Sequence, residues 1–558
     1  MTNDGANSRK VSSSKAFLTF FKSLFGAGLL SLPNVLGKVG LPLGIILYTL
    51  VASGCTVTCF MLVEARDVTE RFLLLPQQQR QSYQKQQGEN NDKEACIEKS
   101  KEGTKQKNHY HLVTYGDLAS ILLGPRMASL TRWIIIVLNF LFSAGLVIVI
   151  CENIVPILFR TSSSRLYTEE EEMDHRRTLG YILFPIISVA LQIPWLQDMW
   201  IISALGLLVY TVGVMGSTIY SSFLTITSAS SLSMTPTDLW QWKWNGIPSF
   251  LGSAVYAMEG INLTLPTVHS MEDKSKSAHV ICSALLTYGA VTLSFASVGY
   301  AGGLGGGPGT MRTKGECDVV TNCIIPEELQ IVMQIALSLA LLLSIPVMMY
   351  PTTEMLEVML TDYYSQQSSQ HREQKNIRQQ EQQHIQYGSV DSTLEERQHF
   401  KHSEISMSNV DSNDDFDMIS NKTFKHTDNI VKEKPHSVIT NSIILDCSTD
   451  NGSNNDCNDI EPYSQEKSWK LRLLLSFFIT LLGCSTKSFT LFSSFVGAVG
   501  LTFAGFILPP LLYYQSMIKA NINIHWYMRL LMGMLVGFGL WNMTIGGVSS
   551  FLDLIHGL

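Results

Sequence analysis

The sequence predicts an all-α membrane protein with eleven spanning helices. Of its 558 residues, 46% are hydrophobic and only 16% are charged. The apolar residues gather in runs of membrane-spanning length, because a bilayer core needs roughly 20 apolar residues per helix. Polar sequence rich in glutamine and asparagine gathers instead in two long inserts. Two of the apolar runs are also interrupted by glycine near their centres, which a continuous helix disfavours.

The eleven predicted helices follow from the apolar runs in chain order. They cover residues 17–36, 39–64, 130–153, 179–195, 199–223, 248–268, 279–300, 329–350, 469–486, 489–514 and 527–550. Helices one to five therefore occupy 17–223, helices six to ten occupy 248–514, and helix eleven with the C-terminus occupies 527–558. Residues 1–16 form a polar tail, and the first apolar run serves as its own insertion signal.

Lysine and arginine predict a cytosolic N-terminus. The tail 1–16 is basic, and most other basic residues lie in the inserts 66–113 and 361–467. With an odd number of helices and the tail inside, both inserts fall in the cytosol, as the positive-inside rule requires. The C-terminus then lies on the far side.

Both inserts are predicted to be disordered, because they contain too few apolar residues to offset the entropy of ordering. They could bind cytosolic regulatory partners, or they could be tolerated linker expansions. After the first insert, Tyr115–Leu123 is too short to span a bilayer and fits an interfacial helix.

Several functional classes are disfavoured. A net charge of -7 without a clustered basic face argues against nucleic acid as a partner. The ten cysteines lack the spacing of metal or redox sites, so no metal or cofactor is expected. The glycine-rich stretch 302–309 has neither the preceding strand nor the following lysine of a phosphate-binding loop. Cys317 and Cys323 lie in the same outer loop, where the compartment permits a disulfide.

The first predicted helix is interrupted by Gly26-Ala27-Gly28. Each glycine costs about 1 kcal/mol relative to alanine in a helix interior. Unwound backbone within a bilayer persists only where protein or a water-filled cavity covers it. Glycines in membrane helices also mark close helix packing, so this feature alone leaves both interpretations open.

Helix six carries a matching interruption at Glu259-Gly260, and both helices close with Leu-x-Leu-Pro, at 30–33 and 263–266. Paired interruptions five helices apart indicate a binding site near the membrane midplane, between two inverted halves of a transporter.

The stretch Lys22 to Pro33 resembles the K-S-x-x-G-x-G-x-L-x-L-P signature of the amino acid/auxin permease family, and is most similar to its proton-coupled and vacuolar branch. The resemblance covers all eleven helices and continues at 115–118, 152–153, 256–266, 350–351, 495–497 and 509–512. It implies a LeuT-like fold of two inverted five-helix repeats plus one extra helix. It also implies amino acid transport in a vacuolar or lysosomal membrane, with the plasma membrane as the alternative. Ala27 and Phe25 depart from the family pattern, so the substrate stays open.

An amino acid zwitterion needs both of its charges matched once water is removed. The amide groups exposed near Ala27 at the start of the outer half of helix one suit a carboxylate. Carbonyl groups freed at both breaks can accept from the ammonium, and Tyr256, the segment 139–143 and helix eight would select the side chain. The predicted substrate site consists of Phe25, Gly26, Ala27, Gly28, Leu29, Tyr256, Met258 and Gly260.

Glu259 is the acidic residue expected nearest mid-membrane, which makes it the first candidate for the proton carrier. It could instead brace the broken helix with a hydrogen bond. Glu152, at the outer end of helix three, is the second candidate, although it could simply face water. A sodium-coupled alternative would use carbonyl groups of helix one with Ser338 or Ser344, and another alternative is a nutrient sensor that acts through the inserts. No recurring constellation of His, Asp and Glu at membrane depth indicates an enzyme.

Overall fold

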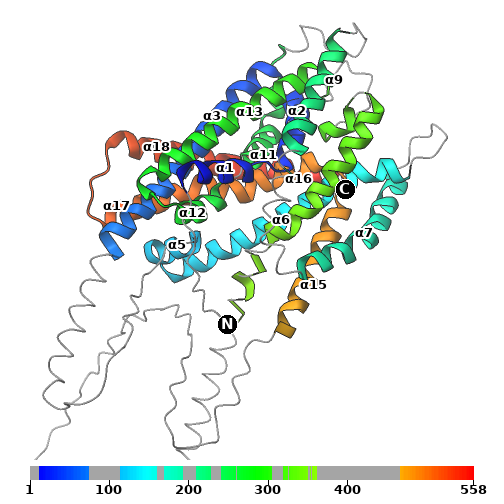
Figure 1. The fold of residues 1–558 in the computed structure, drawn as a ribbon. Helices are drawn as coiled ribbons and strands as arrows, with labels where there is room; N and C mark the ends of the chain where they lie inside the picture. Colours follow the sequence, from blue (N-terminus) through cyan, green and yellow to red (C-terminus); the bar gives the residue numbers. More distant parts are fainter. Residues whose placement is uncertain are drawn as a thin grey trace, which may run out of the picture. The chain divides into compact units, whose positions relative to one another are not determined.

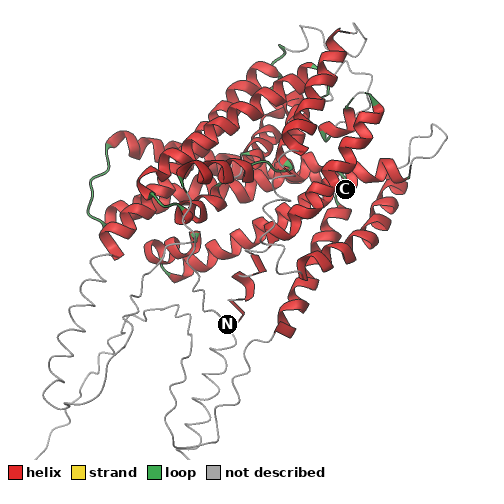
Figure 2. Cartoon of the chain, viewed as in Figure 1, coloured by secondary structure: helices red, strands yellow, loops and turns green. Residues whose placement is uncertain are grey.

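A computed structural model describes the helical part of the chain. The described residues are 12–74, 114–159, 169–192, 206, 209–227, 240–258, 260–304, 318–324, 326–349, 352–353, 355–357, 359–360 and 465–557. Within these ranges the chain is helical and forms no β-strand (Figure 2). The predicted all-α class is therefore confirmed for the part of the chain that the structure describes.

The first half of the chain contains a broken helix followed by several long ones (Figure 1). Its elements are α1 (Ser13–Ser23), α2 (Gly28–Val39), α3 (Leu41–Val68), η1 (Thr69–Leu74), α5 (Tyr115–Leu123), α6 (Pro125–Leu158), α7 (Glu169–Gln192), η4 (Val209–Val214) and α9 (Met215–Thr227).

The second half begins with another broken helix. Its elements are η5 (Trp244–Gly246), α11 (Ile247–Ala257), α12 (Ile261–Ser270), η6 (Lys274–Lys276), α13 (Ser277–Ala301), η7 (Val320–Cys323), the helix Glu327–Met349, α15 (Gln465–Ser485), α16 (Phe489–Val496), η8 (Gly497–Leu501), η9 (Phe503–Ile507), α17 (Leu508–Lys519), α18 (Trp526–Trp541), η10 (Asn542–Gly546) and α19 (Gly547–Gly557).

Helical structure coincides with each predicted apolar run. Among the described residues, six helices are long and apolar enough to cross a membrane, and a seventh joins them if the bent pair α1 and α2 counts as one span. The number of eleven spans and the inverted-repeat arrangement stay predictions. The bundle belongs to one unit, Met1–Leu356 with Ser464–Leu558, and a second unit, Glu357–Tyr463, overlaps the second predicted insert.

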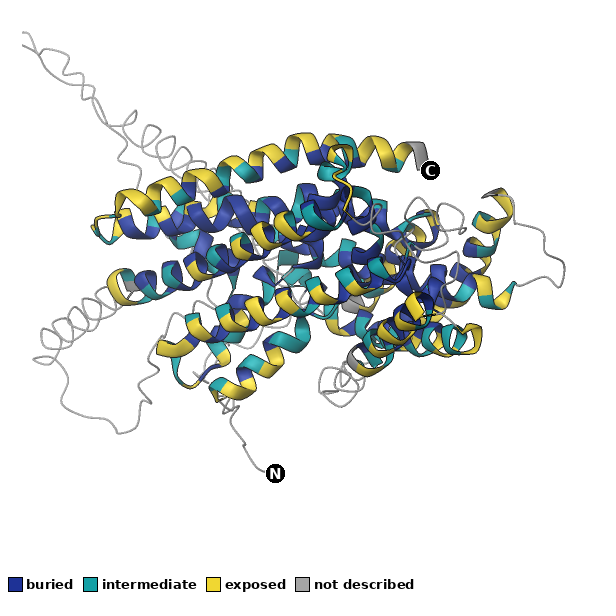
Figure 3. Ribbon diagram, turned by 90° about the horizontal axis from the view of Figure 1, so that it is seen from above, coloured by how far each residue is buried: buried dark blue, intermediate teal, exposed yellow. Residues whose placement is uncertain are grey.

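Exposed residues follow the outer faces of the helices (Figure 3), and many of them are large hydrophobic side chains. Ile46, Leu50 and Val189 are 48%, 64% and 62% exposed, although large aliphatic side chains normally avoid water. Such extensive exposed apolar surface indicates that something other than water covers it. Because the helices are long enough to cross a membrane, a lipid bilayer fits this role.

Inside the bundle, long helices pack in neighbouring pairs. α3 lies beside α13 and α17, whereas α15 lies beside α7 and α6 (Figure 1). α11 packs against both α2 and α16. The two broken helices are therefore held together inside the bundle.

The predicted short helix after the first insert is present as α5, with the expected bounds. Its start is fixed by a capping box: Asp117 N donates to Thr114 Oγ1 (3.2 Å) and Thr114 N donates to Asp117 Oδ2 (3.1 Å). Lys519 Nζ donates to Ile121 O (2.8 Å) at the other end. These contacts join α5 to the end of α17.

Helical structure continues from α3 through η1, into residues expected to begin the first insert. Arg66, only 1% exposed, pairs with Asp67 (3.2 Å) and Glu70 (3.1 Å). Glu70 also pairs with Lys274 at the start of the α13 region (2.9 Å). Because charged side chains this deeply buried need partners, the network explains why the helix extends beyond its apolar run. Residues 75–113 and 361–464 lie outside the described residues, so the predicted disorder of both inserts stays a prediction.

Candidate functional site

The first predicted break is confirmed. α1 ends at Ser23, α2 begins at Gly28, and their axes differ by 58°. Leu29 N donates to Gly26 O over 3.4 Å, and no side chain caps the start of α2. The first amides of a helix lack intrahelical acceptors, and together they form the positive end of its dipole. The break therefore presents donor groups suited to an anionic ligand group.

The second predicted break lies directly against the first. α11 ends at Ala257 and α12 begins at Ile261. A Cβ atom added to Gly28 would lie 2.8 Å from Ala257 Cα and 2.9 Å from Tyr256 Cδ1. The two breaks can meet this closely only because residue 28 has no side chain.

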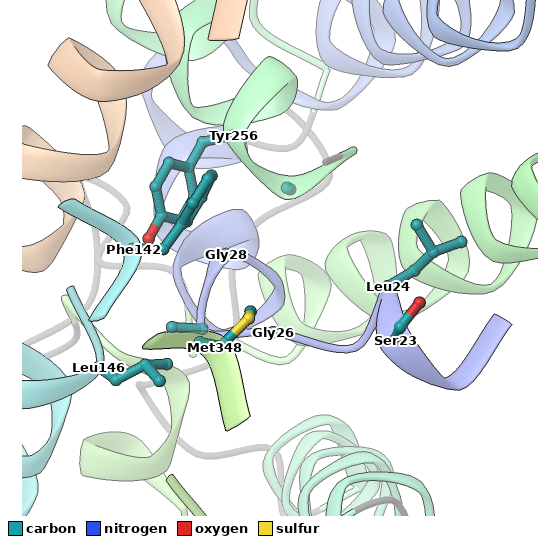
Figure 4. A pocket seen from close by; sticks show the side chains of 10 residues that line it. Ser23, Leu24, Gly26, Gly28, Phe142, Leu146, Tyr256 and Met348 are labelled. Carbon is teal, nitrogen blue, oxygen red and sulfur yellow. The ribbon is translucent and has the colours of Figure 1, made fainter. Parts of the chain in front are cut away.

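A cavity lies beside this contact (Figure 4). The cavity is open in part to its surroundings. Its lining residues come from α1, α2, α6, α11 and the helix Glu327–Met349. They are Ser23, Leu24, Gly26, Ala27, Gly28, Phe142, Leu146, Tyr256, Ala257 and Met348.

The cavity combines backbone polar groups with apolar side chains. Figure 4 shows Tyr256 and Phe142 together on one side and Ser23 with Leu24 on the other. The Tyr256 and Phe142 ring centroids are 4.9 Å apart. None of the described lining residues carries a charged side chain. A small polar solute would therefore be bound by the backbone at the breaks, and its apolar part by Phe142, Leu146 and Met348.

Four of the eight predicted substrate-site residues line the cavity: Gly26, Ala27, Gly28 and Tyr256. The other four lie next to it. The Phe25 ring packs on Phe21 and Tyr288, Leu29 is fully buried, Met258 is 2% exposed, and Gly260 faces Leu24. A role for all eight in substrate binding stays a prediction.

Sequence reasoning named only stretches for the remaining walls. Phe142 lies within the expected segment 139–143, and Met348 lies on the expected helix eight. Leu146 follows Phe142 by one helical turn, which is the sequence signal that could have identified it. Ser23, Leu24 and Ala257 were missed, although they directly flank the two breaks.

Glu152 is buried near the end of α6, at 6% exposure. Its Oε1 accepts a hydrogen bond from Phe489 N (2.7 Å), at the start of α16. Its Oε2 has no hydrogen-bond partner among the described residues. The Phe489 ring packs edge-on against Tyr256, with centroids 5.8 Å apart, so Glu152 is linked to the cavity through one residue. Glu259 lies outside the described residues.

The hydroxyls proposed for sodium do not line the cavity. Ser344 donates to Ala340 O (2.8 Å), whereas Ser338 Oγ is buried without a hydrogen-bond partner in the described part of the chain. Over the same ranges, His, Cys, Asp and Glu form no group of three that could hold a metal. Cys323 is disulfide-bonded, but Cys317 lies outside the described residues and their pairing stays a prediction.

Broken helices that meet at a cavity inside a bundle of membrane-length helices recur in secondary transporters. Comparison with known proteins agrees with this class. The family model for transmembrane amino acid transporter proteins matches residues 9–91 and 96–552. The chain belongs to this family, which points to transport rather than to catalysis.

A curated relative supports the same assignment over a shorter region. The chain is 32% identical over 107 residues to the amino acid transporter AVT3C of Arabidopsis thaliana. This match covers 19% of the chain and 22% of the relative, so the chain spans about a fifth of the relative's length.

Proposed function

We propose that this protein is a secondary active transporter that moves neutral amino acids across a membrane and couples their movement to protons. One observation carries the proposal: the breaks of two helices meet at Gly28 and Ala257 beside a cavity, in a chain of the amino acid transporter family. Unwound backbone inside a membrane bundle is tolerated where it lines such a cavity.

The substrate carboxylate would bind at the start of α2, near Ala27 and Gly28, where the helix dipole favours negative charge. The ammonium would bind carbonyl groups at the breaks, such as those of Phe25 and Met258. The uncharged lining favours a neutral side chain, because a buried charge without a partner is strongly destabilising. Phe142, Leu146 and Met348 would contact that side chain.

We assign proton coupling to Glu152, with Glu259 as the second candidate. Glu152 is buried, and its Oε2 is available for a proton while Oε1 holds the start of α16. Binding a proton would weaken the charge-assisted bond to Phe489 N, because a carboxylate is the stronger acceptor. One pH unit supplies about 1.4 kcal/mol per proton. A gradient of about two units therefore supports roughly hundredfold accumulation with one proton per substrate.

The test is uptake of labelled neutral amino acids into proteoliposomes, with an imposed pH gradient, a sodium gradient or neither. We expect the pH gradient to stimulate uptake by the wild type. Glu152→Gln should remove this stimulation but preserve exchange of labelled for unlabelled substrate. Asp174→Asn is the matched control, because Asp174 is an acidic residue of α7 that is 73% exposed and pairs only with the exposed Arg177 among the described ion pairs.

Each other result has a definite meaning. Stimulation of uptake by the sodium gradient alone would identify sodium, and not the proton, as the coupling ion. Normal coupling in Glu152→Gln and lost coupling in Glu259→Gln would place the proton site in the second broken helix. A wild type with no flux under any gradient would overturn the transport proposal and favour the nutrient sensor.

We place the protein in a vacuolar or lysosomal membrane with its N-terminus in the cytosol. The support is the resemblance to that branch of the family and the basic residues of the tail and inserts. Protease protection of an N-terminal epitope in isolated organelles would test both assignments. The plasma membrane is the alternative location.

A further inference from the structure

The segment Asp318–Ile324 is an irregular connection that is buried inside the bundle. Val319, Thr321 and Cys323 have no exposed surface, and Val320 and Ile324 are 1% exposed. Connecting segments usually run over the surface, because their backbone polar groups need water. This one instead fills a space between helices, which requires specific partners for its polar groups.

Asp318 supplies the first set of partners. Its Oδ1 accepts a hydrogen bond from Asn34 Nδ2 of α2 (2.8 Å), and its Oδ2 accepts one from Ser488 Oγ at the start of α16. Its backbone carbonyl accepts from Thr490 Oγ1 (3.3 Å). The carboxylate thus joins the second half of the first broken helix to the start of α16.

Two further side chains fix the rest of the segment. Thr321 Oγ1 donates to Asn153 Oδ1 of α6 (2.7 Å). Asn322 accepts hydrogen bonds from Gln330 (2.9 Å) and Gln334 (2.9 Å), both on the helix Glu327–Met349. The segment therefore contacts α2, α6, α16 and the helix that carries Met348.

Of these four elements, α2, α6 and the helix Glu327–Met349 also line the cavity. α16 contacts the cavity wall, because the Phe489 ring packs against the lining residue Tyr256. Asn34 follows Gly28 by six positions, or about 9 Å along a helix, and Asn153 follows Leu146 by seven, or about 10 Å. The contacts of Asp318 and Thr321 with α2 and α6 therefore lie about two helical turns from the cavity, toward one end of the bundle. Ser23 and Leu24, from the other half of the first broken helix, line the cavity opposite Tyr256 and Phe142 (Figure 4).

We propose that Asp318 is a positioning residue for transport, because its carboxylate seats the segment 318–324 over the cavity and closes the route from that end of the bundle. This inference rests on the proposed function. Opening that end during the transport cycle requires the bonds from Asn34 and Ser488 to break.

Thiol labelling tests the closure without measuring transport. The full-length protein carrying Leu146→Cys, a cavity-lining position, is reconstituted and exposed on each side in turn to a membrane-impermeant thiosulfonate. The labelled fraction at residue 146 is read by peptide mass spectrometry. We expect Asp318→Ala to raise the labelling rate from the Asp318 side at least tenfold. The matched control, Glu328→Ala, removes an exposed carboxylate from the helix Glu327–Met349 and should leave the rate unchanged.

A charge exchange separates positioning from general damage. Asp318→Asn alone leaves only one acceptor oxygen on this side chain and should raise labelling. Adding Asn34→Asp restores an amide-carboxylate bond with its ends reversed, and should return the rate to within about threefold of the wild type. Equal labelling of wild type and Asp318→Ala would overturn the proposal, as would failure of the exchange to rescue a well-folded Asp318→Asn protein.

If Asp318→Ala does not reach the membrane, Ser488→Ala and Asn34→Ala each remove one of the two bonds and take its place. Faster labelling in either supports the closure, and wild-type rates in both overturn it. Because labelling needs no substrate, the outcome is independent of the uptake assay. A protein that closes in this way but moves no amino acid would contradict only the proposed function.

Discussion

Two glycines of the first break have opposite surroundings. A Cβ atom on Gly28 would meet Ala257 and Tyr256, whereas a Cβ atom on Gly26 would have no heavy atom within 4 Å. Gly28 therefore sets the distance between the two broken helices. Gly26 borders the cavity and leaves room in it.

We predict that Gly28→Ala destabilises the protein and lowers uptake. Overpacking a close contact typically costs about 1–3 kcal/mol, and here part of the clash is with backbone that cannot rotate away. The measurement is thermal unfolding of the detergent-solubilised protein together with uptake in proteoliposomes.

Gly26→Ala is the matched control, because the same methyl group is added two residues away in open space. It should leave thermal stability unchanged, while its effect on the Michaelis constant reports on the cavity. Equal stability losses in both variants would show that the contact with Ala257 does not set the cost at residue 28.

At the scale of elements, the buried charge of Arg66 holds the extension of α3 in place. Arg66 pairs with Asp67 and Glu70, and Glu70 reaches Lys274 next to α13. The network thereby ties together two neighbouring helices at the end from which the first insert leaves.

We predict that Arg66→Met lowers the thermal unfolding temperature. Arg66 is buried, but Asp67 and Glu70 are 20% and 34% exposed and Glu70 keeps Lys274, so the loss of the charged hydrogen bonds should cost about 1–3 kcal/mol. Lys276→Met provides the comparison. Its ion pair with Asp273 is exposed, and such pairs contribute little. Similar melting temperatures for Arg66→Met and wild type would mean that water reaches the carboxylates and replaces the arginine.

Helical structure among the described residues coincides with the predicted apolar runs, but only four of the ten cavity-lining residues were predicted individually. Apolar runs predict helices because burial and bilayer length act locally along the chain, and the breaks at Gly26–Gly28 and Gly260 follow from glycine propensity. Leu146 and Asp318 could not be recognised in that way. Leu146 is one of several leucines in α6. It lines the cavity because α6 packs beside the break of the first helix in the folded protein. Asp318 follows a glycine-rich stretch. Only the apolar residues Val319, Val320 and Ile324 indicate from the sequence that this segment is buried.

At the scale of the whole molecule, the described helices form a unit separate from Glu357–Tyr463. The helices before and after the second insert, Glu327–Met349 and α15, belong to this same unit. The contacts that build the cavity therefore do not require the insert.

We predict that deleting residues 370–460 preserves folding and leaves amino acid uptake within about twofold of the wild type, because the closure entropy of a long loop changes slowly with its length. Uptake and size-exclusion profiles of the shortened protein provide the measurement. Loss of uptake in a well-folded protein would assign the insert a direct role in transport. Loss of a cellular nutrient response with uptake intact would support the sensor alternative.

The contact between α11 and α16 has a mechanical consequence. A Cβ atom on Gly252 would lie 2.1 Å from Ser494 O, and one on Gly497 would lie 1.9 Å from Gly252 O. Backbone packs directly on backbone at these glycines, and beside them Ser494 Oγ donates to Ser249 O (3.0 Å). We therefore expect α11 and α16 to move together. A tilt of α11 at Tyr256 would then also move Ser488 and Phe489, which are hydrogen-bonded to Asp318 and Glu152.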